Sequence, residues 1–426
     1  RLRHQPDDEG WTTTVSLDNT SDDTQALPPL GVAVSVAPGW VGWSWSTDVE
    51  GFLVVAPADG PGECLLVSVR RGFWRAAASV PVVSPAARRG DALGAGVAAF
   101  HLAHPTGSLR AYGRHQTTLE FSAITVPGAA AATLPPWLPE LVVAPGDELV
   151  LHTPDQAIVP GPGVQVTETD SGAVLLGSAG QREVAVHGVR GVQRLRMTCA
   201  PALPALVCEL AGEIIRTRPS GVGSASAAVV ASGLARRVVV DASAALDWLE
   251  REDWLARGDL WGPAIAGVVA NETHDAGLVE DACAALLAAD PLPGMGIIGS
   301  RLWLATLRAG LPPFDLMAVF ARAGSGLSGL ESAVLRNADA ARWGRAVRGL
   351  VARLGAGLPG QPVGLAEADA GLAVALLRHV PEGWAEREAA TLASEKAAAL
   401  LLADHADRLH PAHDGLAWLL MGEISA

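Results

Sequence analysis

The chain is predicted to be a multidomain β + α protein: an N-terminal antiparallel β-sandwich, a small Ig-like β unit and a C-terminal antiparallel α-helical array of the α/α-hairpin type. Three observations predict this class. Short apolar segments, punctuated by Gly and Pro, fill the first part of the chain. A second group of such segments follows a proline-rich stretch. The apolar period then changes from 2 to 3.6 residues.

The N-terminal β-sandwich is predicted to cover residues 1–135. In GVAVSVAPG, the residues Val32, Val34 and Val36 share one face of a strand, and Pro and Gly follow at its end. GFLVVAP, CLLVSVRRG and TTLEFSAI continue at similar spacing, which is typical of an all-β sandwich. PGAAAATLPPWLPE, at the end of this domain, is expected to be a linker.

The Ig-like β domain and a linker are assigned to residues 136–230. DELVLHT, GVQVTET, GAVLLGS, REVAVHG and GVQRLRMTC read as short strands separated by Gly-rich turns. A continuation of the first sandwich is the alternative.

The α-helical domain is assigned to residues 235–426. In AARWGRAVRGLVARL the apolar residues form a stripe at helical spacing, and Arg342, Arg345 and Arg348 lie away from it. Further helical patterns cover about 244–256, 300–309, 366–379, 386–403 and 414–424. The short Pro- and Gly-rich separators predict antiparallel neighbours that stack as hairpins.

The charge balance is acidic, with 45 Asp and Glu against 31 Lys and Arg and a net charge of −14. Such a field repels phosphate backbones, so we expect no nucleic-acid partner. No apolar run reaches the length of a membrane span, and no signal-like segment is present, which favours a cytoplasmic protein. The basic residues are almost all arginine, which suggests a GC-rich bacterial genome.

No motif predicts a cofactor or a metal. The four cysteines form no CxxC pair. The G-x-G-x-x-G at Gly294, Gly296 and Gly299 follows a helical segment rather than a strand, so a helix-to-helix turn is the better interpretation. HADRLHPAHD, which includes His405, His410 and His413, is interpreted as a polar loop because its spacing matches no known metal site.

The stretch GWVGWSWSTD gives the first candidate ligand-binding residues. On a strand, Trp43 and Trp45 share a face and could stack on sugar rings, with Asp48 binding hydroxyl groups. The alternative is that both indoles point into the sandwich, and the serines of the opposite face favour it. Tyr112 and Arg114, at the entrance of a predicted strand, are further candidates.

The domain order is similar to that of carbohydrate-active enzymes such as glycogen-debranching enzymes and disaccharide phosphorylases. Those families join an N-terminal sandwich to an α/α toroid that carries the acidic residues, and the resemblance covers domain order alone. If the chain is an enzyme, the resemblance implies a glycoside hydrolase- or phosphorylase-like mechanism with two carboxylates. The acidic groups near the start of the helical region form the pool for such a pair: Glu250, Glu252, Asp253, Asp259, Glu272 and Asp275.

Three hypotheses follow. The first is a carbohydrate-active or carbohydrate-binding protein that takes an oligosaccharide. The second is a non-enzymatic scaffold whose helical array binds a protein partner through Arg342, Arg345 and Arg348. The third is a subunit or fragment of a larger assembly, suggested by a chain that begins with Arg1.

Overall fold

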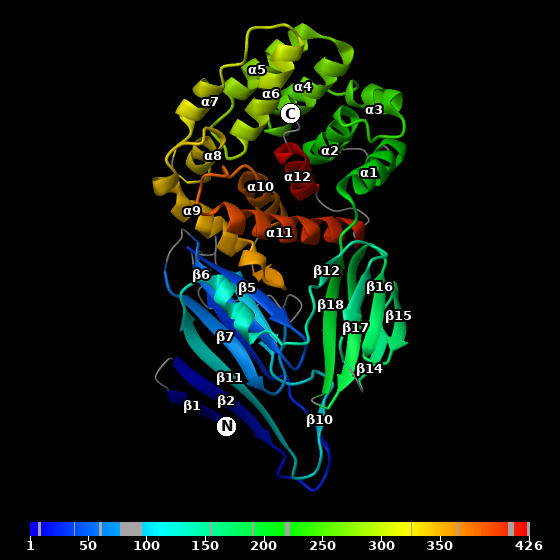
Figure 1. Cartoon of the computed structure of the whole chain (residues 1–426), viewed down its shortest axis with the longest axis vertical. Coiled ribbons are helices and arrows are strands. Elements are labelled where there is room, and N and C mark those ends of the chain that lie inside the picture. Colours follow the sequence, from blue (N-terminus) through cyan, green and yellow to red (C-terminus); the bar gives the residue numbers. More distant parts are fainter. Residues whose placement is uncertain are drawn as a thin grey trace. The chain divides into compact units, whose positions relative to one another are not determined.

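The computed structural model describes residues 1–6, 10–37, 39–58, 62–76, 96–153, 156–189, 191–217, 222–324, 326–363, 366–407 and 413–423. The chain divides into two compact units (Figure 1). The β-strand unit comprises Arg1–Cys199 and Arg348–Leu365, and the helical unit comprises Ala200–Val347 and Ala366–Ala426. The predicted fold class, antiparallel β-sheets followed by a helical region, is confirmed.

A seven-stranded antiparallel sheet is the largest element of the β-strand unit, in the order β1-β2-β11-β7-β6-β5-β19. Its strands are β1 (Leu2–Pro6), β2 (Gly10–Asp18), β11 (Arg114–Ile124), β7 (Cys64–Arg71), β6 (Gly51–Pro57), β5 (Trp40–Ser46) and β19 (Gln361–Val363). A three-stranded sheet contains β4 (Gly31–Val36), β9 (Gly96–His101) and β8 (Arg75–Ala76). A small ribbon pairs β3 (Gln25–Ala26) with β10 (Ser108–Leu109).

The first core lies between the seven-stranded and three-stranded sheets. Leu53, Val67 and Leu119 come from the large sheet, and Val36 and Phe100 come from the small one. All five side chains are buried because alternate residues of each strand point to the same face. The alternating apolar residues of the sequence therefore form the interior of a sandwich.

A second pair of sheets follows in the same unit. One sheet has the order β12-β18-β17-β14, and the other has the order β13-β16-β15. Their strands are β12 (Val142–Val143), β13 (Glu148–Leu151), β14 (Ala157–Pro160), β15 (Val164–Thr169), β16 (Gly172–Gly177), β17 (Gly180–Gly188) and β18 (Gly191–Cys199). Leu151, Leu175, Val186 and Met197 fill the space between the sheets.

The expected linker is packed rather than free. Residues Pro127–Thr133 form a 3-10 helix, η2, with Ala130 fully buried. This helix contacts β6, β7 and β11. The small side chain of Ala130, in a stretch that looks like linker composition in the sequence, allows this close approach.

The helical region contains α1 (Leu203–Thr217), α2 (Ser224–Ala235), α3 (Ala242–Leu249), α4 (Trp261–Thr273), α5 (Ala276–Ala288), α6 (Met295–Arg308), α7 (Leu316–Arg322), α8 (Leu327–Leu335), α9 (Ala340–Arg353), α10 (Glu367–Arg378), α11 (Arg387–Asp407) and α12 (Asp414–Gly422). Short 3-10 turns are η3 (Leu255–Arg257) and η4 (Gly355–Gly357). The main contacts pair α4 with α5, and α10 with both α11 and α12. Among the described residues, no helix has the length and apolar character needed to cross a bilayer.

The first helices begin earlier than the expected change of period at residue 235. Helices α1 and α2 occupy part of the segment that was assigned to the Ig-like domain and its linker. Helix α2 is buried at nearly every position, so it has no polar face and no 3.6-residue pattern. Periodicity alone cannot detect a helix of this kind.

Candidate functional site

A pocket of about 880 Å³ lies in the β-strand unit. Both pairs of sheets contribute to its wall, through β7 and β11 of the first pair and β17 and β18 of the second. The charged and titratable lining residues are Asp48, Arg71, Arg75, Arg114, Arg194, His104, His115 and His187. Phe73 adds an aromatic surface.

Asp48 lies in the turn between β5 and β6. Its backbone has a left-handed φ of 76°, which Asp tolerates better than most residues. The turn closes through a hydrogen bond from the Thr47 amide to the Glu50 carbonyl (2.8 Å). The neighbouring segments bind the same turn: the Trp74 amide donates to the Asp48 carbonyl, and the Arg194 amide donates to the Thr47 carbonyl, each at 2.9 Å.

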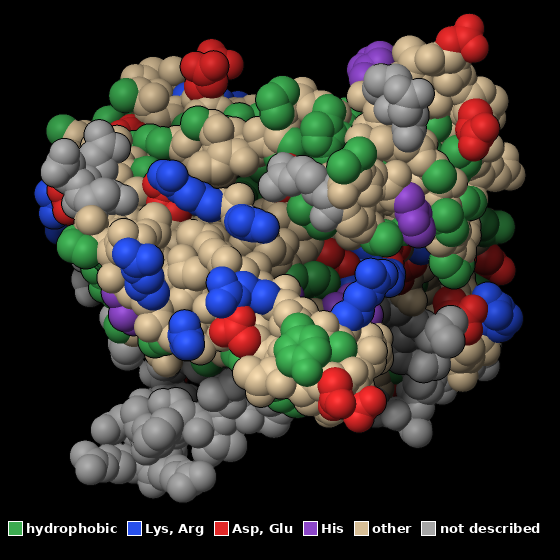
Figure 2. Space-filling model, turned by 90° about the horizontal axis from the view of Figure 1, so that it is seen from below, with side chains coloured by type: hydrophobic (Ala, Val, Ile, Leu, Met, Phe, Trp, Pro, Cys, Tyr) green, Lys and Arg blue, Asp and Glu red, His purple; other side chains and the backbone are tan. Residues whose placement is uncertain are grey.

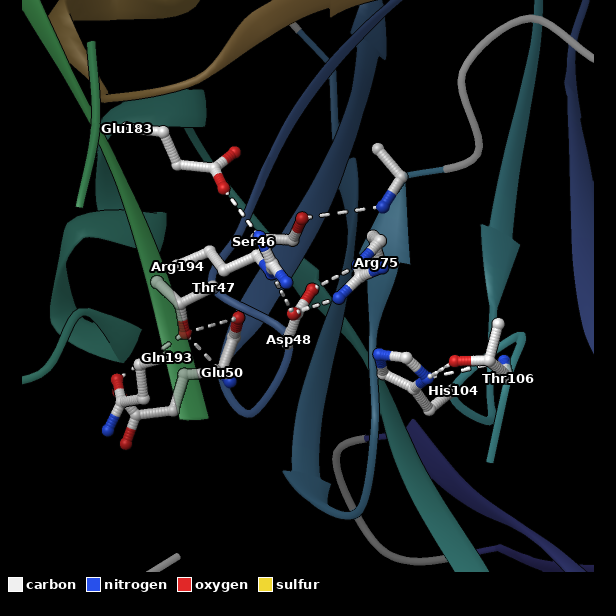
Figure 3. Close-up of polar contacts among 11 residues, drawn as sticks. Ser46, Thr47, Asp48, Glu50, Arg75, His104, Thr106, Glu183, Gln193 and Arg194 are labelled. Carbon is white, nitrogen blue, oxygen red and sulfur yellow. Dashed lines mark hydrogen bonds and ion pairs between the residues drawn. The ribbon is translucent and has the colours of Figure 1, made fainter. Parts of the chain in front are cut away.

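The Asp48 carboxylate binds two arginines from different sheets, as Figure 3 shows. Arg75 Nε donates to Asp48 Oδ1 at 2.6 Å, and Arg75 Nη2 bonds Oδ2. Arg194 Nε lies 3.2 Å from the same Oδ2. Hydrogen bonding to Asp48 raises the pKa of Arg75 above its ordinary value. Only 6% of the Asp48 side chain is exposed, so little water competes for the carboxylate.

Arg71 enters the pocket from a β-bulge at the end of β7. The register between β7 and β11 shifts there: Val69 pairs with Leu119, and Arg71 pairs with Thr118. Such bulges bend a strand and change the direction of a side chain. Gly72 follows with a φ of 108°, and a Cβ on it would lie 2.4 Å from Thr117 Oγ1. Among the described residues, the exposed Arg71 side chain has no ion-pair or hydrogen-bond partner.

Two of the histidines are held by defined hydrogen bonds. His115 Nε2 lies 2.6 Å from the Leu102 carbonyl, which can only accept, so this nitrogen carries a proton. His104 Nδ1 accepts from the Thr106 amide (3.3 Å), which leaves its Nε2–H as a donor. Both rings therefore have a fixed orientation at the pocket.

The pocket carries excess positive charge although the protein is acidic. Four arginines line it, and Asp48 is its one carboxylate among the described residues. Two further carboxylates lie beside these arginines: Asp18 pairs with Arg114, and Glu183 lies 2.6 Å from Arg194. Even so, the Arg71 guanidinium has no carboxylate partner among the residues that the structure describes. Figure 2 shows Lys and Arg side chains gathered over the middle of one face of the protein.

Trp43 and Trp45 are part of the core, so their indoles offer no surface to a sugar ring. Their exposed fractions are 3% and 7%. Trp43 Nε1 donates to the Pro359 carbonyl at 2.9 Å, and β19 pairs with β5 over the same residue. Trp45 packs against Phe52. Their burial removes the argument for a sugar platform, so the alternative interpretation, in which both indoles belong to the core, describes these two residues.

Of the three other predicted ligand-binding residues, two line the pocket and one does not. Asp48 and Arg114 both line the pocket. Tyr112 is 74% exposed in the turn before β11 and is absent from the lining. The missed residues include Arg71, Arg75 and Arg194. The sequence offers no local motif for this set, because Arg194 lies more than 100 positions from the other two.

The acidic pool of the helical region is engaged in local contacts. Asp259 accepts from the Trp261 and Gly262 amides at the start of α4, and Asp275 accepts from the Leu278 amide of α5. Glu252 pairs with Arg257, and Glu272 pairs with Arg237. These contacts cap helices and form surface ion pairs. The contacts therefore indicate structural roles for these four acidic residues.

The histidine-rich segment was interpreted as a polar loop. His405 Nδ1 lies 2.8 Å from the Leu401 carbonyl within α11, and His413 Nδ1 lies 2.7 Å from Ser226 Oγ. His410 lies outside the described residues. Over the part of the chain that the structure describes, no three His, Cys, Asp or Glu residues are grouped as metal ligands.

The predicted partner-binding arginines, Arg342, Arg345 and Arg348, are exposed along α9. The Arg342 guanidinium lies 5.2 Å from the ring centre of its neighbour Trp343. A protein partner for this row stays a prediction.

No protein-family model matches the chain, and no curated protein matches it. Among solved structures, the chain is similar to a polysaccharide lyase, with a TM-score of 0.54 and 9% sequence identity. The alignment covers 94% of this chain and 68% of that one. At this identity, the likeness is one of fold.

Proposed function

We propose that this chain is a carbohydrate-active protein that binds an acidic saccharide in the pocket around Asp48. The fold supports the carbohydrate class through its likeness to a polysaccharide lyase. One fold can serve many functions, so the class of ligand is inferred from the pocket rather than from the fold. The observation that carries it is the arginine-rich lining in a chain with a net charge of −14.

The chemistry of the lining suits carboxylate or sulfate groups on sugars. Guanidinium groups present several N–H donors in a plane and bind such anions with charge-assisted hydrogen bonds. His104 Nε2–H is a further donor, and Phe73 provides an apolar surface beside it. A volume of about 880 Å³ lies within the range of ligand pockets.

Arg71 is the residue for the first test, because its charge is not used within the described structure. Arg71→Gln should weaken binding of an oligoglucuronate about 10- to 100-fold, the value of one hydrogen bond to a charged group. Arg70→Gln is the matched control. It removes the same charge from the neighbouring position, but Arg70 pairs with Glu120 and does not line the pocket.

Isothermal titration calorimetry with oligoglucuronates, and with neutral gluco-oligosaccharides of the same length, measures these affinities. The acidic ligand should bind and the neutral one should not. Equal affinity for both would contradict the proposal, and so would equal losses in Arg71→Gln and Arg70→Gln.

A further inference from the structure

Asp48 is negatively charged, yet it lies in the wall of a pocket to which we assign an anionic ligand. Its carboxylate binds Arg75 of β8 and Arg194 of β18, which belong to different pairs of sheets. We propose that Asp48 is a positioning residue that fixes these two arginines for ligand binding. This inference rests on the function proposed above.

The geometry leaves part of each guanidinium available. Arg75 uses Nε and Nη2 on Asp48, so its Nη1 has no hydrogen-bond partner among the described residues. Arg194 uses Nε on Asp48 and Nη1 on Glu183, so its Nη2 is likewise unused there. Both side chains line the pocket. The carboxylate therefore restrains two long side chains while their remaining donors stay available.

Asp48 can act in this way because its own position is fixed from both sides. The Trp74 amide donates to its carbonyl, and the Arg194 amide donates to the adjacent Thr47 carbonyl. Thr47 Oγ1 also lies 3.5 Å from Gln193 Oε1 (Figure 3). Side chains that are ordered before binding lose less entropy when the ligand arrives.

Removing the Asp48 charge distinguishes positioning from simple electrostatics. Asp48→Asn makes the pocket more positive, so a purely electrostatic role predicts tighter binding of an anion. A positioning role predicts weaker binding, because Arg75 and Arg194 lose their common acceptor. The matched control is Glu183→Gln. It removes the same charge beside Arg194, but from a side chain that is 46% exposed.

We expect Asp48→Asn to weaken oligoglucuronate binding about tenfold and to make its dependence on salt shallower, since fewer ordered charges contact the ligand. Glu183→Gln should bind equally well or more tightly. Arg75→Lys keeps the charge but loses the planar two-point contact, so it should also bind more weakly. Thermal unfolding and circular dichroism check that each variant is folded. Unchanged or tighter binding by Asp48→Asn would overturn the inference.

A ligand-free measurement separates this inference from the proposed function. In ¹⁵N-labelled protein, the Nε–H signals of Arg75 and Arg194 should be protected from exchange in the wild type and broadened in Asp48→Asn. If the wild type binds no acidic oligosaccharide, the proposed function fails. These signals still show whether Asp48 fixes the guanidinium groups of Arg75 and Arg194. Signals that do not change in Asp48→Asn would overturn the positioning role.

Discussion

At the scale of single residues, exposure decides what an aromatic side chain can do. Trp43 and Trp40 lie on the same strand, β5, yet Trp43 is 3% exposed and Trp40 is 41% exposed. The two side chains are three positions apart, so they point to opposite faces of the strand, and the segment after α9 covers the face that carries Trp43. Gly355 has a φ of 77°, and a Cβ at this position would lie 2.3 Å from the Trp43 ring. Only glycine allows the chain to cover the indole so closely.

Substitution of Trp43 therefore tests whether its indole is part of the core. Trp43→Ala should lower the free energy of unfolding by about 3–5 kcal/mol, the typical cost of removing a large core aromatic. Trp43→Phe should cost less, since it mainly leaves the Pro359 carbonyl without its donor. Urea unfolding measures both values. Affinity for the acidic oligosaccharide should not change in folded Trp43→Phe, and a specific loss there would instead favour the sugar platform.

At the scale of elements, the glycine motif of α6 acquires a structural explanation. Gly294 precedes the helix with a φ of 101°, and a Cβ there would lie 2.0 Å from the ring of Trp418. The first amides of the helix need acceptors, and Glu331 of α8 supplies them. Glu331 accepts from the Gly294 amide at 2.8 Å and from the Ile297 amide at 2.7 Å. The glycines thus serve a helix start and its packing.

Glu331 should make stability depend on pH. Burial raises its pKa to about 7, although the amides of Ile297, Gly294 and Gly296 oppose the shift. Because the folded-state pKa is the higher one, the stabilisation is complete below about pH 4.5 and is lost as pH rises through about 7. Relative to Glu331→Gln, the wild type should lose about 3 kcal/mol over this window. Urea unfolding of both proteins at several pH values measures the difference, and a difference that does not vary with pH would contradict the assignment.

At the scale of the whole molecule, local and global charge have opposite signs. The chain carries −14 overall, while arginines dominate one pocket. Near physiological ionic strength, charges farther apart than about 8 Å are largely screened. A ligand in the pocket therefore interacts mainly with the nearby arginines and only weakly with the total charge.

Screening of the nearby arginines by salt should also weaken binding of the ligand. Affinity for an acidic oligosaccharide should fall between about 0.15 M and about 1 M salt, where the Debye length shrinks from about 8 Å to about 3 Å. Calorimetric titrations at several salt concentrations measure the trend. An affinity that rises with salt would mean that the net negative charge controls binding, which would contradict a cationic site.

Much of the fold was predictable because its signals are local. Alternating residues such as Val32, Val34 and Val36 identify strands, and the stripe of α9 identifies a helix. Helices expected at 366–379, 386–403 and 414–424 are present as α10, α11 and α12. Helix α2 escaped detection because burial on all sides removes the amphipathic pattern.

The candidate site was only partly predictable. Local sequence patterns predict the order of the β and α regions, the composition gives the acidic charge, and two of the predicted ligand residues, Asp48 and Arg114, line the pocket. Only the tertiary structure brought Asp48 together with Arg75 and Arg194, and only it covered Trp43 with a segment more than 300 positions later. The physical reason is the same in both cases. Periodicity reports which face of an element is apolar, whereas side-chain contacts between distant segments depend on how the sheets pair and pack.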